Sequence, residues 1–150
     1  MRWLSLHSWW LLLAVAVILF VFGLGDLLAG APDNALAVTA KTNEQLAAQS
    51  PAAYRLVELG VRTGGVQLMF IGAVSATILV FGFRRNLRWA WWAMWSLPLL
   101  SAALAVVHLT SVAPGQTPAV PVYSGAVVTV LTAATLFASA PRFFARLGGI

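Results

Sequence analysis

Four long segments of this chain are almost free of charged residues, and each is long enough to cross a membrane as a helix. They span about residues 9–29, 62–83, 89–110 and 121–140. The hydrocarbon core of a bilayer is about 30 Å thick, which a helix crosses in roughly 20 residues. Strands of a membrane barrel alternate in polarity and are about half as long, so the pattern predicts helices.

The composition leads to the same prediction. Hydrophobic residues make up 61% of the 150 residues and charged residues only 9%, against about 25% charged in an average soluble domain. A soluble chain of this length could not bury so much apolar surface. We therefore expect an all-α integral membrane four-helix bundle with up-down topology. Residues 1–150 would form a single transmembrane domain, with one polar outer loop at about 30–61.

The first segment also has features of a signal peptide. Arg2 precedes an apolar core, and the triplet Ala29-Gly30-Ala31 is a candidate cleavage site. However, the apolar run is longer than a usual signal-peptide core, and Pro32 directly follows the triplet. These features favour an uncleaved helix.

Basic residues are unequally distributed between the connections. If the N-terminus is cytoplasmic, the inner side holds Arg2, Arg84, Arg85, Arg88, Arg142 and Arg146, and the outer side holds Lys41, Arg55 and Arg62. No acid accompanies the inner group. Because short cytoplasmic loops carry the excess of Lys and Arg, both termini are predicted to be cytoplasmic in a multi-pass cell membrane protein.

All seven tryptophans fall at the predicted cytoplasmic level: Trp3, Trp9, Trp10, Trp89, Trp91, Trp92 and Trp95. Indole rings prefer the headgroup boundary, and the neighbouring Arg84, Arg85 and Arg88 can pair with lipid phosphates. We predict that these ten residues anchor the protein in the lipid bilayer, with Trp91, Trp92 and Trp95 facing lipid. Nucleic-acid binding is not expected, because the turn is too short and too close to the membrane to bind a strand.

Polar residues near the outer ends of the helices form the candidate ligand site: Asp26, Gln67, Ser101 and His108. Ionisable residues inside membrane segments often have a function. At about 100° per residue, Ser101 and His108 share a helix face directed toward the bundle. Each residue also has an ordinary alternative role, namely an interhelical hydrogen bond or contact with water. Asp26 could pair with Arg62 or His108.

The second segment has a face of small and weakly polar residues: Gly60, Gly64, Gln67, Ile71, Val74, Ser75 and Ile78. Such faces let membrane helices approach closely, so this face is predicted to pack inside the bundle. Glu58 and Arg62 lie on another face, four residues apart, which predicts a surface ion pair. A ligand site on this pair is a secondary hypothesis. A further small-residue stripe, Gly125, Thr129 and Ala133, predicts a packing face on the fourth helix.

Local signals predict three more details. Residues 42–49 could form a short surface helix. Ser50 followed by Pro51 is typical of a helix start, so a helix should begin there and run into the second span. Pro98 inside the third span predicts a kink.

Sequence motifs for catalysis are lacking. There is no phosphate-binding loop, no GxSxG, no HExxH and no cysteine, and only four acids occur. The two histidines, His7 and His108, are predicted at opposite sides of the membrane, so they cannot share a metal or a haem. No metal and no cofactor is predicted, although haem ligation by His108 alone is an alternative. The sequence leans against an enzyme without deciding the matter.

The run RRNLRWAWWAMWSLPLL, at 84–100, follows the second span and the polar outer loop. In this respect the chain resembles uncharacterised small four-helix bacterial membrane proteins, broadly DoxX-like ones. The resemblance covers the hydropathy layout of nearly the whole chain. It implies an up-down four-helix bundle in a bacterial inner membrane, and it brings no catalytic residues.

Three classes of function are compatible with these features. The first is a non-enzymatic accessory or assembly subunit, or a homo-oligomer, whose partners are other membrane helices. The second is a binder or transporter of a small lipophilic molecule in the outer half of the bundle. The third is a membrane enzyme or redox carrier that uses His108.

Overall fold

The computed structural model describes residues 2–30, 34–118 and 120–144, and every regular element in this part of the chain is helical. The elements are α1 (Arg2–Ala29), α2 (Asn34–Thr39), α3 (Asn43–Gln49), α4 (Pro51–Ile78), the π-helix η1 (Leu79–Phe83), α5 (Arg88–Met94), α6 (Ser96–Thr110) and α7 (Val120–Phe144). Four helical stretches are long and apolar enough to cross a membrane: His7–Ala29, Pro51–Phe83, Arg88–Thr110 and Val122–Phe144. The all-α class and the four apolar helices are therefore confirmed.

The predicted starts of two helices are also confirmed. Helix α3 is capped by Thr42, whose side chain accepts from the backbone N–H of Gln45 while the Gln45 side chain accepts from the Thr42 N–H. Helix α4 begins at Pro51, and the Ser50 hydroxyl accepts from the Ala53 N–H. Both contacts satisfy N–H groups that the first turn of a helix leaves unpaired. The short helix α2 was not predicted.

The chain reverses direction between η1 and α5 in a tight turn. The N–H of Arg84 bonds to the carbonyl of Leu79 at 3.0 Å, which is the wide π-helical spacing, and the N–H of Leu87 bonds to Gly82 at 3.1 Å. A Cβ at Gly82 would lie 2.6 Å from the Cβ of Ala90, so the returning helix needs glycine there. Asn86 adopts a left-handed conformation with φ of 55°, which asparagine tolerates better than most residues.

The helix predicted to kink at Pro98 is interrupted one turn earlier in the chain. Helix α5 ends at Met94 and α6 begins at Ser96, with Trp95 between them. Proline has no N–H for the carbonyl four residues before it, and its ring clashes with that carbonyl. In this helix that carbonyl belongs to Met94, so the break between α5 and α6 falls where the proline requires it.

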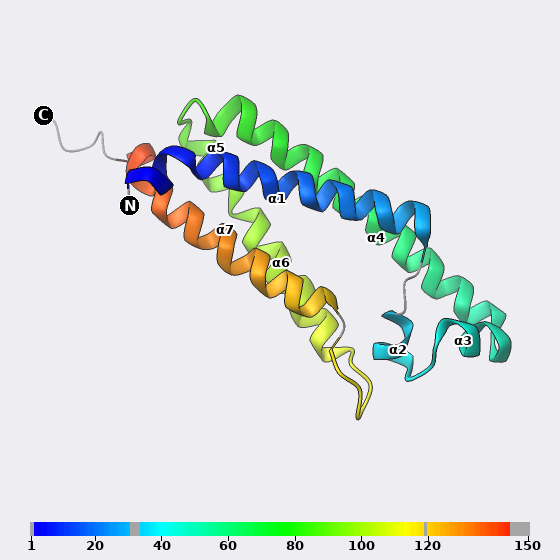
Figure 1. Cartoon of the computed structure of the whole chain (residues 1–150). Helices are drawn as coiled ribbons and strands as arrows, with labels where there is room; N and C mark the ends of the chain where they lie inside the picture. The colour runs from blue at the N-terminus through cyan, green and yellow to red at the C-terminus, as the bar shows by residue number, and fades with distance from the viewer. Residues whose placement is uncertain (1, 31–33, 119, 145–150) are drawn as a thin grey trace, which may run out of the picture.

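Helices α1 and α4 form an antiparallel hairpin in which the backbones approach closely (Figure 1). A Cβ added to Gly65 would lie 2.6 Å from the carbonyl oxygen of Gly23, and one added to Gly72 would lie 2.6 Å from that of Ala16. Both pairs repeat after seven residues on each helix, as a helix pair with a shallow crossing requires. Glycine at 23, 65 and 72 therefore sets this interface.

The predicted packing face of α4 is confirmed only in part, because Ile71, Ser75 and Ile78 pack into the core but the centre of the buried face is turned. The residues of α4 and η1 that the chain itself buries are Gly65, Gly72, Ser75, Leu79, Gly82 and Phe83. At about 100° per residue, the centre of this face lies roughly 90° from the predicted one. Ser75 belongs to the buried set, but Gly60 and Gln67 are exposed. The buried face is turned in this way because Gly65 and Gly72 allow a closer approach to the backbone of α1.

Helices α6 and α7 form a second hairpin, which uses the predicted stripe on α7. A Cβ at Gly125 would come within 3.1 Å of the Cβ of Ala105. The Thr129 hydroxyl lies 2.8 Å from the carbonyl of Gly125 and 3.5 Å from that of Pro98. The prediction that Gly125 and Thr129 form a packing face is confirmed, and the face is used within the chain.

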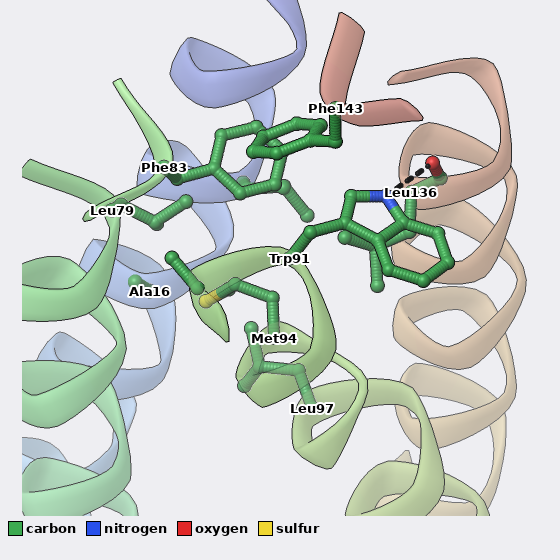
Figure 2. Packing of buried hydrophobic residues seen from close by; sticks show 10 residues of the cluster. Ala16, Leu79, Phe83, Trp91, Met94, Leu97, Leu136 and Phe143 are labelled. Carbon is green, nitrogen blue, oxygen red and sulfur yellow. Dashed lines mark hydrogen bonds between the residues drawn. The ribbon is translucent and has the colours of Figure 1, made fainter. Parts of the chain in front are cut away.

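The two hairpins meet mainly at one end. We call this the arginine end; it holds the first turns of α1, the turn at 84–87 and the last turns of α7. The large buried apolar side chains cluster there (Figure 2): Leu12, Leu79, Phe83, Trp91, Met94, Leu97, Leu136 and Phe143. At the opposite end, the loop end, the hairpins diverge in Figure 1. A backbone hydrogen bond there joins Ala113 to Ala37 of α2 at 2.9 Å.

Candidate functional site

Arg142 connects three elements at the arginine end. One guanidinium nitrogen lies 3.0 Å from Oδ1 of Asn86 in the turn, and another lies 3.4 Å from the hydroxyl of Ser8 in α1. Ser8 is fully buried. Since Arg142 stands on α7, these bonds hold the two hairpins and the turn together. The sequence predicts only that Arg142 lies on the cytoplasmic side. No local pattern relates residues 8, 86 and 142.

Trp91 of α5 contributes a contact to α7 at the same end. Its indole N–H donates to the carbonyl of Leu136 at 3.1 Å, and its ring lies edge-on to Phe144 at 5.1 Å between centroids. The side chain is only 6% exposed. The expectation that Trp91 faces lipid is therefore wrong. The tryptophan-rich run at 89–95 hides this role, because any of its four tryptophans could lie at the membrane interface or in the core.

The other tryptophans differ in exposure. Trp10, Trp89 and Trp92 are more than half exposed, which agrees with a lipid-facing position, whereas Trp9 and Trp95 are half-buried. Trp95 packs against Phe137 of α7, with 5.0 Å between centroids. The side chain of Trp3 lies outside the described residues. The anchoring role itself stays a prediction.

The arginines of the turn differ in how far other groups engage them. Nε of Arg88 donates to the carbonyl of Phe143 at 3.3 Å, so Arg88 helps to hold α7. The guanidinium of Arg84 lies over the ring of Trp9, 4.7 Å from its centroid. The guanidinium of Arg85 has no hydrogen bond or ion pair within the described residues. Together with Val80 and Phe81, Arg84 and Arg85 line an open hollow of about 300 Å³.

The acids of the described residues lie at the other end of the molecule. All four, Asp26, Asp33, Glu44 and Glu58, fall between residues 26 and 58 of the chain. The described ones belong to the last turns of α1, to α3 and to the first turns of α4, all at the loop end. The arginine end therefore carries positive charge that no carboxylate of the described chain neutralises.

The candidate ligand residues are divided between the hairpins. Asp26 and Gln67 stand on α1 and α4, and Ser101 and His108 stand on α6, which packs against α7. Gln67 is exposed, so it does not make the predicted contact inside the chain. The backbone oxygen of Ser101 faces Gly125 of α7. The structure does not gather these four residues into one site.

His108 and Asp26 have simple surroundings. Nδ1 of His108 lies 2.8 Å from the carbonyl of Leu104 in its own helix, an arrangement that needs no ligand. The carboxylate of Asp26 makes no ion pair within the described residues, so neither of its predicted partners is engaged. Among the described residues there is no group of three or more side chains that could hold a metal ion.

The secondary candidates form the predicted surface pair. Nη2 of Arg62 lies 2.8 Å from Oε1 of Glu58, four residues earlier on α4. The pair stands beside Gly30, which ends α1 with φ of 74° and donates its N–H to the carbonyl of Asp26. A Cβ at Gly30 would lie 3.6 Å from the Glu58 carboxylate. Helix α4 thus presents its charges to the end of α1.

No protein-family model, no curated protein and no solved structure matches this chain. The resemblance to DoxX-like proteins stays a prediction. What the geometry defines is a helical protein with four apolar helices, a cationic end without acids and an exposed glycine-containing face on α4.

Proposed function

We propose that this chain is a multi-pass membrane protein that acts as a non-enzymatic accessory or assembly subunit, or as a homo-oligomer, through contacts between helices in the bilayer. Both termini would lie in the cytoplasm, and the chain would cross the bilayer in up-down order. The excess of basic residues at the arginine end supports this orientation, because cytoplasmic ends of membrane helices carry such an excess.

The observation that carries the proposal is the exposed face of α4. Gly60 and Gly64 are four residues apart, and a Cβ at either position would meet nothing within 4 Å. Gln67 follows on the same face and is exposed. In lipid, a small-xxx-small pair lets a second helix approach, and a neighbouring amide can donate a hydrogen bond across the contact. The fold leaves this face free, so its partner would come from another chain.

Disulfide crosslinking tests the proposal, because the chain contains no cysteine of its own. Gln67→Cys in native membranes is expected to give a crosslinked dimer, or a crosslink to a partner that carries a cysteine at the contact. Val66→Cys, at a neighbouring exposed position on a different face, is the matched control and should crosslink much less. Equal crosslinking of both variants would contradict a specific contact through this face.

The second candidate, a binder of a small lipophilic molecule between the hairpins, needs Asp26, Gln67, Ser101 and His108 to converge. This would require the loop end to close on the ligand. Native mass spectrometry of the gently extracted protein distinguishes the two candidates. Added protein chains support the first, and a discrete added mass of a few hundred daltons, lost in the variant Gln67→Leu/His108→Leu, supports the second.

A further inference from the structure

We propose that Arg84 and Arg85 form a binding site for the phosphate headgroup of an anionic phospholipid at the arginine end. The inference rests on the proposed membrane insertion but not on the oligomeric state. It starts from the hollow of about 300 Å³ that the two arginines line together with Val80 and Phe81.

The hollow joins two kinds of surface that a phospholipid needs. Phe81 is 59% exposed and Val80 is 36% exposed, so they offer apolar surface on the lipid-facing side of η1. The guanidinium groups lie next to them, where the chain leaves η1 for the turn. An acyl chain can contact the apolar part while the phosphate reaches the arginines, as at the boundary of a bilayer.

The guanidinium groups of Arg84 and Arg85 have N–H donors that no described group of the fold accepts, in contrast to those of Arg88 and Arg142. Arg142 and Arg88 donate to groups of the fold itself. Among the described residues, the guanidinium of Arg84 is engaged only through its contact with the ring of Trp9. This contact holds the guanidinium in place and leaves the N–H donors in its plane unused. The guanidinium of Arg85 has no hydrogen bond or ion pair within the described part of the chain. Guanidinium groups match phosphate oxygens in a two-pronged geometry.

The backbone of the turn does not compete for this role. The N–H groups of Arg84, Arg85, Asn86 and Leu87 all bond to carbonyls of η1. Recognition therefore depends on the side chains, and the lack of acids at this end leaves them without an internal counter-ion. A phosphate diester supplies that counter-ion.

The test measures lipid selectivity by native mass spectrometry. The full-length protein in mild detergent is incubated with equal amounts of phosphatidylglycerol and phosphatidylcholine. We expect phosphatidylglycerol to be retained preferentially, and this preference to fall roughly fivefold for each arginine lost in Arg84→Gln/Arg85→Gln. Lys41→Gln/Arg55→Gln removes the same charge from the loop end and should keep the preference.

Further arms separate the alternatives. An unchanged preference in the arginine double variant would overturn the proposal. Displacement of phosphatidylglycerol by inorganic phosphate at similar concentrations would also overturn it, since the site would then bind free phosphate. Arg84→Lys/Arg85→Lys keeps both charges and should retain part of the preference, which separates loss of the site from loss of the fold.

The proposed insertion has its own readout in the same experiments. Resistance of the protein to carbonate extraction from membranes reports insertion and does not depend on lipid charge. A protein that is extracted by carbonate contradicts the proposed function. A protein that resists extraction but shows no lipid preference contradicts only the headgroup site.

Discussion

Trp91 and Trp95 lie four residues apart and both contact α7, but only one of them has an acceptor for its indole N–H. Trp91 donates to the carbonyl of Leu136, whereas Nε1 of Trp95 is buried and has no partner among the described residues. A buried donor without an acceptor costs free energy, and a satisfied one stabilises modestly. Two chemically identical side chains should therefore respond differently to the same substitution.

We expect Trp91→Phe to lower the free energy of unfolding by about 2 kcal/mol or more, because it removes a hydrogen bond together with packed ring area. Trp95→Phe also removes ring area, but it removes an unpaired N–H as well, so its cost should be clearly smaller. Unfolding of both variants in mixed micelles, followed by circular dichroism, measures the difference. Equal costs would show that the bond to Leu136 contributes nothing.

Asn86 combines two roles that substitution can separate. Its backbone has φ of 55°, and its side-chain oxygen accepts from Arg142. Asn86→Gly loses only the acceptor, while Asn86→Ala also forces a Cβ into the left-handed region. We expect the alanine variant to be less stable than the glycine variant by about 1–2 kcal/mol. The same unfolding measurement checks the order, and the reverse order would refute the assigned backbone role.

At the scale of elements, the sequence was informative about where helices run and much less so about which faces meet. Hydropathy over a span depends on many residues, so the four apolar stretches could be predicted. The helix starts at Thr42 and Pro51 could be predicted from the residues that cap them. The face of α4 depends on single glycines. Gly60/Gly64 and Gly65/Gly72 both offer small residues, and only the partner helix decides between them. For the same reason the contacts of Arg142 could not be predicted.

The glycine contact between α1 and α4 leads to a prediction about this hairpin. Gly72→Ala places a Cβ 2.6 Å from the carbonyl oxygen of Ala16, so the backbones must separate. A loss of roughly 1–3 kcal/mol in unfolding free energy is expected, as for other overpacked sites. Gly25→Ala, in α1 with nothing within 4 Å of the new Cβ, is the control. It should be neutral or slightly stabilising, since alanine favours helix.

For the whole molecule, charge and packing are both unequal between the two ends. The acids and the ion pair of Glu58 and Arg62 belong to the loop end, while the arginine end holds the buried core and the unneutralised cations. Helix α4 with η1 is 33 residues long, or about 50 Å, which exceeds the bilayer core of about 30 Å. Its first two turns, with Arg55 and Glu58, would then stand outside the hydrocarbon.

Lys41, the single lysine of the chain, allows the orientation to be tested. Its side chain is exposed in the loop-end segment between α2 and α3. An amine reagent that cannot cross membranes is expected to modify Lys41 in intact cells, because the positive-inside rule predicts that this end lies outside. Lys41→Arg removes the signal and serves as the control. Modification of Lys41 only after the cells are opened would show that the predicted topology is inverted.

Because the core lies at one end of the molecule, the two hairpins can turn relative to each other about that end. Each hairpin is held along its length by close helix contacts, but the two hairpins are joined chiefly by Arg142 and by the packed side chains around Phe83 and Phe143. A rod about 30 Å long that turns by about 10° moves its far end by roughly 5 Å. Small changes in these contacts, or in the thickness of a bilayer around the proposed spans, would thus produce large changes in the distance between the hairpins at the loop end. The backbone hydrogen bond from Ala113 to Ala37 limits this distance.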